Sequence, residues 1–304
     1  MSNNPHSLLT HGWGYYLIDP LFKGNDFRTD CHPLTFKDKF DLTKSYMLVG
    51  CEPETMFKPG TEPNKLDFFW WDNTLLPWLR YISAANKDGH KLWSRITYRG
   101  WNMPSNSLLL EEHRKRVNER LHHESNGLIK DIQDLWGGCR STKSVKKKHA
   151  LIVSSSERNH KEFYNETQVD WILKVVNVLK EMGYTFGIRK KVPVYLRHGN
   201  QIVDEMRNGG YDLLIGNHTA STSEAVVLGY PVITTTENNP ARDVSTHWED
   251  FIKGKIKQFD HEQINNWVTR ICAYTYWRDE INDLSWIDVH PQAGHLKDKR
   301  YKRA

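Results

Sequence analysis

Between residues 150 and 234 the chain alternates short apolar runs with segments of helical periodicity, and this alternation strongly constrains the fold. The apolar runs are four or five residues long, as buried strands are, and each is bounded by turn-forming residues. The expected strands are 150–153, 184–188, 211–215 and 231–234, and the expected helices are 169–182, 201–206 and 222–228. Strands that alternate with helices over short turns predict an α/β domain with a parallel sheet and right-handed crossovers.

The longest of these helices illustrates the pattern. Apolar residues stand at positions 169, 172, 173, 176 and 179, which is helical spacing, and Gly183 follows as a C-terminal cap. Beyond 234, helices are expected at about 240–252 and 260–276, where they complete or brace the domain.

The first half of the chain is less regular, and we expect a second, smaller α/β domain there. Its expected strands are 15–18, 46–49 and 92–98, and its expected helices are 74–85 and 108–121. A length of 304 residues suits two domains. The expected division is an N-terminal domain 1–140, a basic linker 141–148, a C-terminal domain 149–290 and a basic tail 291–304.

Composition narrows the class of protein. A mean hydropathy of -0.69 and the absence of any apolar run near the roughly 20 residues of a membrane span predict a water-soluble chain. Residues 1–6 lack the basic and apolar regions of a signal peptide, so we expect a cytoplasmic protein. The four cysteines form no CxxC pair, which predicts neither a disulfide framework nor a metal site.

Basic residues and tryptophans are the two unusual features of the composition. The net charge is +5, and lysines 146–148 and the segment 297–303 hold much of the excess. Such runs are usually solvated; the alternative is contact with a polyanion, either nucleic acid or a phosphorylated donor. Seven of the twelve tryptophans lie in the first 140 residues, where core packing or a cleft for sugars or flipped bases would use them.

The segment 211–243 is the most informative about function. A buried strand ends at Gly216, and seven mostly small, polar residues then lead into a helix. Helix N-termini present unpaired N–H groups and a partial positive charge, so they bind phosphate readily. Glu224 stands in the first helical turn, where its carboxylate could reach ribose hydroxyls. The alternative is that these serines, threonines and Glu224 only cap the helix.

Residues 221–233 fit the pattern S-x-x-E-A-x-x-x-G-x-P-V-I. This pattern resembles the donor-site segment of GT-B glycosyltransferases, and most of all the capsule-polysaccharide and related surface-glycan transferases, in which a histidine often precedes the serine. The resemblance covers about 149–250, and sugar-nucleotide epimerases share much of the motif. It implies that Glu224 binds the donor ribose and that the small residues before it lie near the diphosphate. The donor-site residues that it implies are His218, Ser221, Thr222, Ser223 and Glu224.

The resemblance also implies two Rossmann-like domains and sugar transfer from a nucleotide-sugar to a hydroxyl without a metal or any further cofactor. Further donor contacts are expected where other strands of the C-terminal domain end, because ligands bind outside the carboxyl ends of parallel strands. Solvated loops and surface charge are the alternative at these positions. The residues are Ser155, Ser156, Arg158, Arg189 and Arg242. No G-x-G-x-x-G or Walker A sequence is present, which disfavours NAD enzymes and P-loop NTPases.

A transferase that inverts its sugar also needs a general base, which the N-terminal domain normally supplies. The candidates are His11, which precedes a Gly-Trp-Gly turn, Asp19, Asp72 and Glu52. For the acceptor, the basic charge slightly favours duplex DNA with a hydroxymethylated base, as in phage DNA-modifying glycosyltransferases, over a glycan. A phage-encoded protein of this type would act in the host cytoplasm.

Two functions from other classes remain open. One is a sugar-nucleotide epimerase or hydrolase, which would use the same donor site without an acceptor. The other is a non-enzymatic nucleic-acid-binding protein that has kept a degenerate Rossmann domain.

Overall fold

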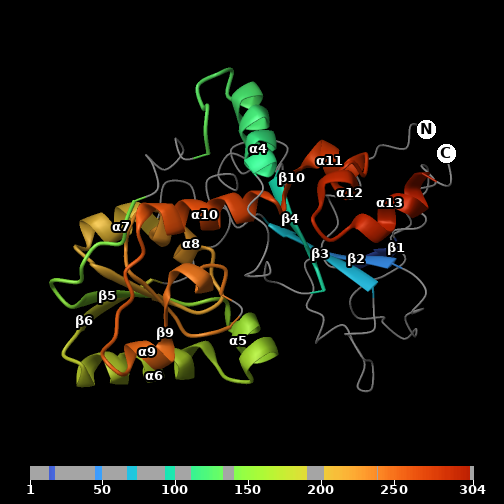
Figure 1. The fold of residues 1–304 in the computed structure, drawn as a ribbon. Helices are drawn as coiled ribbons and strands as arrows, with labels where there is room; N and C mark the ends of the chain where they lie inside the picture. Colours follow the sequence, from blue (N-terminus) through green and yellow to red (C-terminus); the bar gives the residue numbers. More distant parts are fainter. Residues whose placement is uncertain are drawn as a thin grey trace. The chain divides into compact units, whose positions relative to one another are not determined.

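The computed structural model describes residues 14–17, 45–49, 67–73, 93–99, 111–132, 140–189, 202–237 and 239–301. The chain divides into two units, each with one five-stranded sheet (Figure 1). Unit 1 comprises residues 1–120 and 269–304, and unit 2 comprises residues 121–268. Within the described residues, no helix has both the length and the apolar character needed to cross a membrane.

The sheet of unit 2 is parallel throughout, in the order β6-β5-β7-β8-β9. Its strands are β5 (His149–Val153), β6 (Thr185–Arg189), β7 (Leu213–Gly216), β8 (Val232–Thr234) and β9 (Thr246–His247). The predicted α/β class and parallel sheet are therefore confirmed for this unit, and the arrangement is compatible with a Rossmann-like fold. The inner strands β5 and β7 are apolar runs with fully buried interiors, because helices cover both faces of a parallel sheet.

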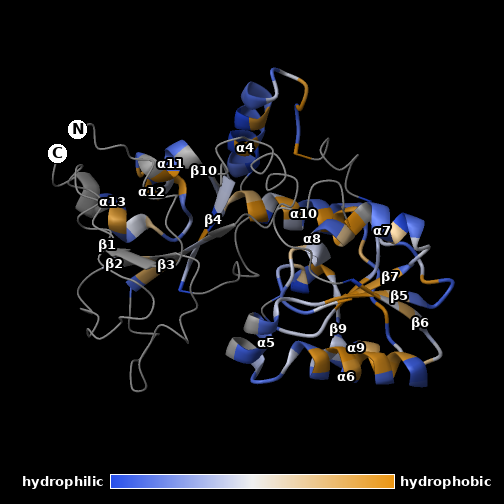
Figure 2. Cartoon of the chain, turned by 180° about the vertical axis from the view of Figure 1, so that it is seen from behind, coloured by the Kyte–Doolittle hydropathy of each residue, from blue (hydrophilic) through white to orange (hydrophobic). Residues whose placement is uncertain are grey.

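Two layers of helices enclose this sheet. Helices α6 (Gln168–Glu181) and α9 (Trp248–Phe251) lie on one face, and α7 (Ile202–Asn208) and α8 (Ser221–Val227) lie on the other (Figures 1 and 2). The remaining elements of the unit are α5 (Glu157–Tyr164), a 3-10 turn η6 (Arg242–Val244) and the first part of α10 (His261–Cys272). The helix expected at about 240–252 is instead η6, β9 and α9 in succession.

The buried stripe of α6 differs from the one that the apolar spacing predicted. Trp171, Val175 and Leu179 pack into the core, whereas Val169 is 61% and Leu173 is 52% exposed. The large Trp171 ring fills the space beside β5 and rotates the helix away from the stripe through 169 and 173. Thr167 and Asp170 form a capping box that fixes where the helix begins.

The sheet of unit 1 is mixed, in the order β1-β2-β3-β4-β10. Its strands are β1 (Gly14–Leu17), β2 (Ser45–Val49), β3 (Asp67–Asn73), β4 (Trp93–Tyr98) and β10 (Thr275–Trp277). Only β2 and β3 pair in parallel, and the other three pairs are antiparallel. This pairing differs from the parallel sheet expected of a second Rossmann-like domain. The expected helix 74–85 lies outside the described residues.

The division of the chain also differs from the expected boundaries, which assigned residues as far as 290 to the C-terminal domain. Strand β10 pairs with β4, and Trp277 stands opposite Trp93. Trp286 and Leu296 are fully buried in the same core as Phe69 of β3. Apolar burial therefore draws 269–301 into unit 1, and the expected tail includes a packed helix. Among the described residues of unit 1, the helices are α4 (Glu111–Glu124, whose last turn belongs to unit 2), α11 (Arg278–Asn282), α12 (Trp286–Val289) and α13 (Gly294–Tyr301).

Candidate functional site at the carboxyl edge of the unit 2 sheet

The strand order of unit 2 defines where a ligand would bind. The chain runs outward from β5 to β6 on one side and then returns to β7, β8 and β9 on the other. In doubly wound sheets of this order, ligands bind at the carboxyl ends of the two strands where the direction reverses. Here those strands are β5 and β7, which end at Val153 and Gly216.

Asn217 joins the two strand ends at this switch point. Its Oδ1 accepts the backbone N–H of Ser155 at 2.8 Å, and its Nδ2 donates to Ser155 Oγ at 3.0 Å and to His160 Nε2 at 2.9 Å. Asn217 and His160 are fully buried, and Ser155 is 3% exposed. Because both protons of the Asn217 amide are used, His160 must accept through Nε2, which requires the neutral ring. Burial lowers the pKa of His160, in agreement with this state.

Asn239 connects the loop after β8 to the same centre. Its Nδ2 donates to the Asn217 carbonyl, and its Oδ1 accepts from Thr222 Oγ1 at 2.9 Å and from the Ala241 N–H at 2.8 Å. Thr222 is fully buried and Asn239 is 2% exposed. The ends of β5, β7 and β8 and the first turn of α8 thus share one buried polar network, which we call the switch-point network.

The start of α8 is not capped in the way that the alternative interpretation required. The N-cap residue is Ala220, whose side chain cannot cap, and Thr219 Oγ1 accepts the Ser221 N–H at 3.4 Å. Thr222, Ser223 and Glu224 are instead buried, and the Ser223 hydroxyl has no hydrogen-bond partner among the described residues. Glu224 is only 2% exposed, so a ligand that reaches its carboxylate must first displace part of the surrounding chain.

Two of the predicted donor-site arginines, Arg189 and Arg242, are paired with carboxylates. Arg189 forms an ion pair with Glu205 of α7 at 2.8 Å. Arg242 pairs with Glu237, and its Nη1 lies 3.4 Å from the Thr236 carbonyl. An incoming diphosphate would have to compete with these carboxylates.

The remaining donor candidates have different surroundings. Ser156 is the N-cap of α5, where its hydroxyl accepts the Asn159 N–H at 3.3 Å. His218 and Ser221 are half-buried beside the switch-point network. Arg158 lies in α5, and its side chain is outside the described part of the chain. The carboxyl edge therefore links Ser155 to Thr222 through hydrogen bonds of Asn217 and Asn239.

The side chains of the catalytic candidates in the first half of the chain lie outside the described part of the structure. His11, Asp19 and Glu52 are not among the described residues, and Asp72 lies in β3, opposite Arg95, with a side chain that is not described. Sequence reasoning missed a different acid–base pair in unit 1. His295 Nε2 of α13 lies 3.0 Å from the carboxylate of Asp67, which also accepts the Ser45 hydroxyl. Only the tertiary structure reveals this pair, because its two residues are 228 positions apart in the sequence.

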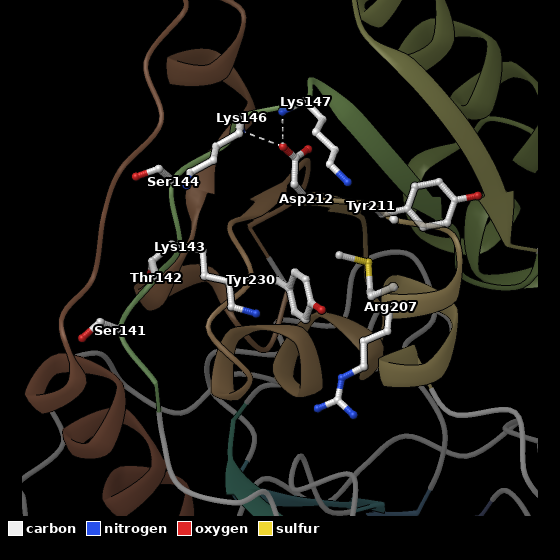
Figure 3. A pocket seen from close by; sticks show the side chains of 12 residues that line it. Ser141, Thr142, Lys143, Ser144, Lys146, Lys147, Arg207, Tyr211, Asp212 and Tyr230 are labelled. Atoms are coloured by element: carbon white, nitrogen blue, oxygen red, sulfur yellow. Dashed lines mark hydrogen bonds between the residues drawn. The ribbon is translucent and has the colours of Figure 1, made fainter.

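A separate concave region lies at the opposite, amino edge of the same sheet. Its volume is about 800 Å³, and it is lined by residues 141–147 and by residues that precede β7 and β8 (Figure 3). None of the predicted donor residues lines it.

Comparison of the chain with protein-family models, with curated proteins and with solved structures finds no match. Within the part of the chain that the structure describes, no group of three or more His, Cys, Asp and Glu side chains could hold a metal ion. The functional argument therefore depends on the geometry of unit 2 and on the sequence motif at α8.

Proposed function

We propose that unit 2 binds a nucleotide-sugar at the carboxyl edge of its sheet and that the protein transfers the sugar to a hydroxyl acceptor. The observation that supports this proposal is the switch-point network. Buried serine, threonine and asparagine side chains meet where β5 and β7 end, which is where doubly wound sheets bind nucleotides. The motif at 221–233 supplies the donor class, and a modified base of duplex DNA is the preferred acceptor over a glycan.

The proposed chemistry is a substitution at the anomeric carbon. The acceptor oxygen bonds to this carbon as the bond to the diphosphate oxygen breaks, and a general base takes the acceptor proton. The Ser155 hydroxyl would donate a hydrogen bond to the departing diphosphate and keep its proton. Arg189 and Arg242 would exchange Glu205 and Glu237 for phosphate oxygens, which gives charge stabilisation without a metal. The candidates for the base, His11, Asp19, Asp72 and Glu52, belong to unit 1.

One observation favours a second function, that of a non-enzymatic binding protein with a degenerate nucleotide site. Glu224 is 2% exposed, and Arg189 and Arg242 already have carboxylate partners. A site that had lost its ligand would retain such internal pairing, because a buried charge without a partner is costly.

A thermal-shift screen against nucleoside diphosphates and nucleotide-sugars tests the proposal. A ligand at 100 times its Kd adds about 2.7 kcal/mol of stability, which gives a measurable rise in Tm. We expect one nucleotide class to raise the Tm of the wild type. The same nucleotides should not raise the Tm of Glu224→Gln or of Arg242→Ala. The exposed Glu262→Gln is the matched control and should retain the shift. Stabilisation by no nucleotide would overturn the donor site.

A further inference from the structure

The pocket at the amino edge of the unit 2 sheet is built around a basic segment of the chain. This segment, residues 140–148, is called the basic arm below. It forms one wall of the pocket, and the end of α7 and the residues before β7 and β8 form the rest (Figure 3). The cations and aromatic residues that line the pocket are Lys143, Lys146, Lys147, Arg207, Tyr211 and Tyr230.

The basic arm is held against unit 2 along its length, although the sequence predicted a linker there. The backbone N–H of Thr142 donates to the Phe259 carbonyl at 2.8 Å, and that of Lys143 donates to the Gly229 carbonyl at 2.8 Å. Backbone hydrogen bonds fix the path of a chain without restricting its side chains. Lys143, Lys146 and Lys147 therefore line the pocket from a wall whose path is fixed.

Asp212 is the acidic residue that lines the pocket, and its carboxylate is hydrogen-bonded to the backbone of the arm. Its carboxylate accepts the N–H groups of Lys146 at 2.7 Å, Lys147 at 2.6 Å and His149 at 3.1 Å. Burial raises the pKa of Asp212, but these backbone hydrogen bonds outweigh burial and hold it below its usual value. The ammonium groups of Lys146 and Lys147 take no part in these bonds.

Within the part of the chain that the structure describes, the four cations of the pocket form no ion pair with a carboxylate. Among the described residues, no carboxylate oxygen lies within 4 Å of the charged groups of Lys143, Lys146, Lys147 or Arg207. Lysines elsewhere in unit 2 do form such pairs, and the examples are Lys161, Lys174 and Lys257.

The ammonium of Lys143 lies against an aromatic ring and close to other positive charges. Its ammonium lies 4.2 Å from the centre of the Tyr230 ring. Burial lowers the pKa of Lys143 first, and the charges of Arg140 and Arg207 lower it further. Like charges that converge in a hollow without a counter-ion create a positive potential, which an anionic ligand would relieve.

We propose that this pocket binds the phosphate backbone of a nucleic-acid strand. Lys143 and Lys147 are four residues apart, which allows a separation of up to about 14 Å along an extended arm and suits successive phosphates better than a single one. Tyr230 beside Lys143 provides the combination of aromatic surface and charge that sequence-tolerant binding of single strands uses, whereas the Tyr211 ring already stacks on His149 with its centroid 4.4 Å away. The inference does not depend on the proposed sugar transfer, because its site lies at the other edge of the sheet.

Fluorescence anisotropy with a labelled 20-nucleotide single strand and the matching duplex tests this site. The variant is Lys143→Ala with Lys146→Ala and Lys147→Ala, which keeps every backbone N–H that holds the arm. Each phosphate contact contributes about 0.7 to 0.9 to the slope of log Kobs against log salt. We therefore expect the triple variant to lower this slope by about 2 to 3 and to weaken binding at low salt.

The control is a second triple variant, Lys161→Ala with Lys174→Ala and Lys257→Ala. It changes the formal net charge by the same amount, from +5 to +2, but removes cations that already have carboxylate partners. It should retain the wild-type slope. Equal losses in both variants would show a general charge effect and overturn the proposal, as would a wild type that binds neither oligonucleotide.

Two further experiments identify the class of ligand. Poly-glutamate should not compete for the site at equal charge concentration, and equal competition would overturn a nucleic-acid site. Loss of nucleoside-diphosphate binding in the arm variant, with oligonucleotide binding unchanged, would assign the pocket to a small phosphate ligand instead. Glu224→Gln should leave oligonucleotide binding intact, so failure of the donor site and failure of this site give different results.

Discussion

Asn217 Oδ1 accepts the backbone N–H of Ser155 at 2.8 Å, and this bond joins the carboxyl ends of two adjacent parallel strands. The two residues are 62 positions apart in the chain. Parallel strands pair through their backbones, but the loops that leave them do not, so the loop N–H groups need side-chain partners when they are buried. At this edge an asparagine fulfils that need at the point where a doubly wound sheet receives its ligand.

Asn217→Ala should destabilise unit 2 by about 3 kcal/mol. The substitution leaves the Ser155 N–H and His160 Nε2 without their partners, and each buried unsatisfied group costs about 1–3 kcal/mol. Urea unfolding followed by circular dichroism measures the loss. Asn208→Ala, at an exposed position, is the control and should stay within about 0.5 kcal/mol of wild type. A similar small effect at Asn217 would contradict the role of the network.

Gly229→Ala should destabilise the protein more than Gly183→Ala does. Both glycines have positive φ, of 78° and 74°, so either substitution incurs a backbone cost of about 1–2 kcal/mol. A Cβ at Gly229 would also lie 2.7 Å from the Ser141 carbonyl oxygen, whereas a Cβ at Gly183 would meet no atom within 4 Å.

The difference between these two variants isolates the contact between Gly229 and the basic arm. We expect urea unfolding to show at least about 1 kcal/mol of additional loss at Gly229. Trypsin should also cleave the arm faster in Gly229→Ala, because the close contact with Ser141 is disturbed. Equal stability and equal cleavage in the two variants would show that the arm is not held at this point.

Stability should fall as the pH is lowered from about 7 to 5. Burial lowers the pKa of His290 to about 3, and its neutral ring donates from Nε2 to the Ile96 carbonyl and accepts the Gln292 N–H at Nδ1. Burial is also the largest cause of the lowered pKa values of His113 and His160. Below pH 6.5 the unfolded chain binds protons that the folded chain excludes, so the free energy of unfolding decreases as pH falls.

For His290 alone this decrease approaches about 1.4 kcal/mol per pH unit below the unfolded pKa and continues toward pH 3. Urea unfolding at pH 7.5, 6.5, 5.5 and 5.0 measures the slope. The variant His261→Gln, at an exposed position, is the control and should leave the slope unchanged. A free energy of unfolding that is constant or rises toward pH 5 would contradict the buried neutral histidines.

Much of unit 2 was predictable because its signals are local. The apolar runs at β5 and β7, the helix after Thr167 and the polar turn after Gly216 each lie within about fifteen residues, and hydrophobic periodicity reports structure at that range. The same signals predicted the parallel sheet and placed Ser155 and Thr222 at one edge of it. They did not predict Asn217 as the residue that joins the strand ends, because the side-chain amide of an asparagine in a turn can form hydrogen bonds with many different groups.

The sequence by itself therefore determined the α/β class and the carboxyl edge of the sheet where the candidate donor-site residues Ser155 and Thr222 lie. Only the tertiary structure decided the mixed sheet of unit 1, the pairing of β10 with β4 and the docking of the basic arm on Asp212. The physical reason is distance along the chain. Propensity and periodicity act between neighbours in sequence, whereas strand pairing and the partner of a buried polar group are selected among residues far apart, by the packing of the whole unit.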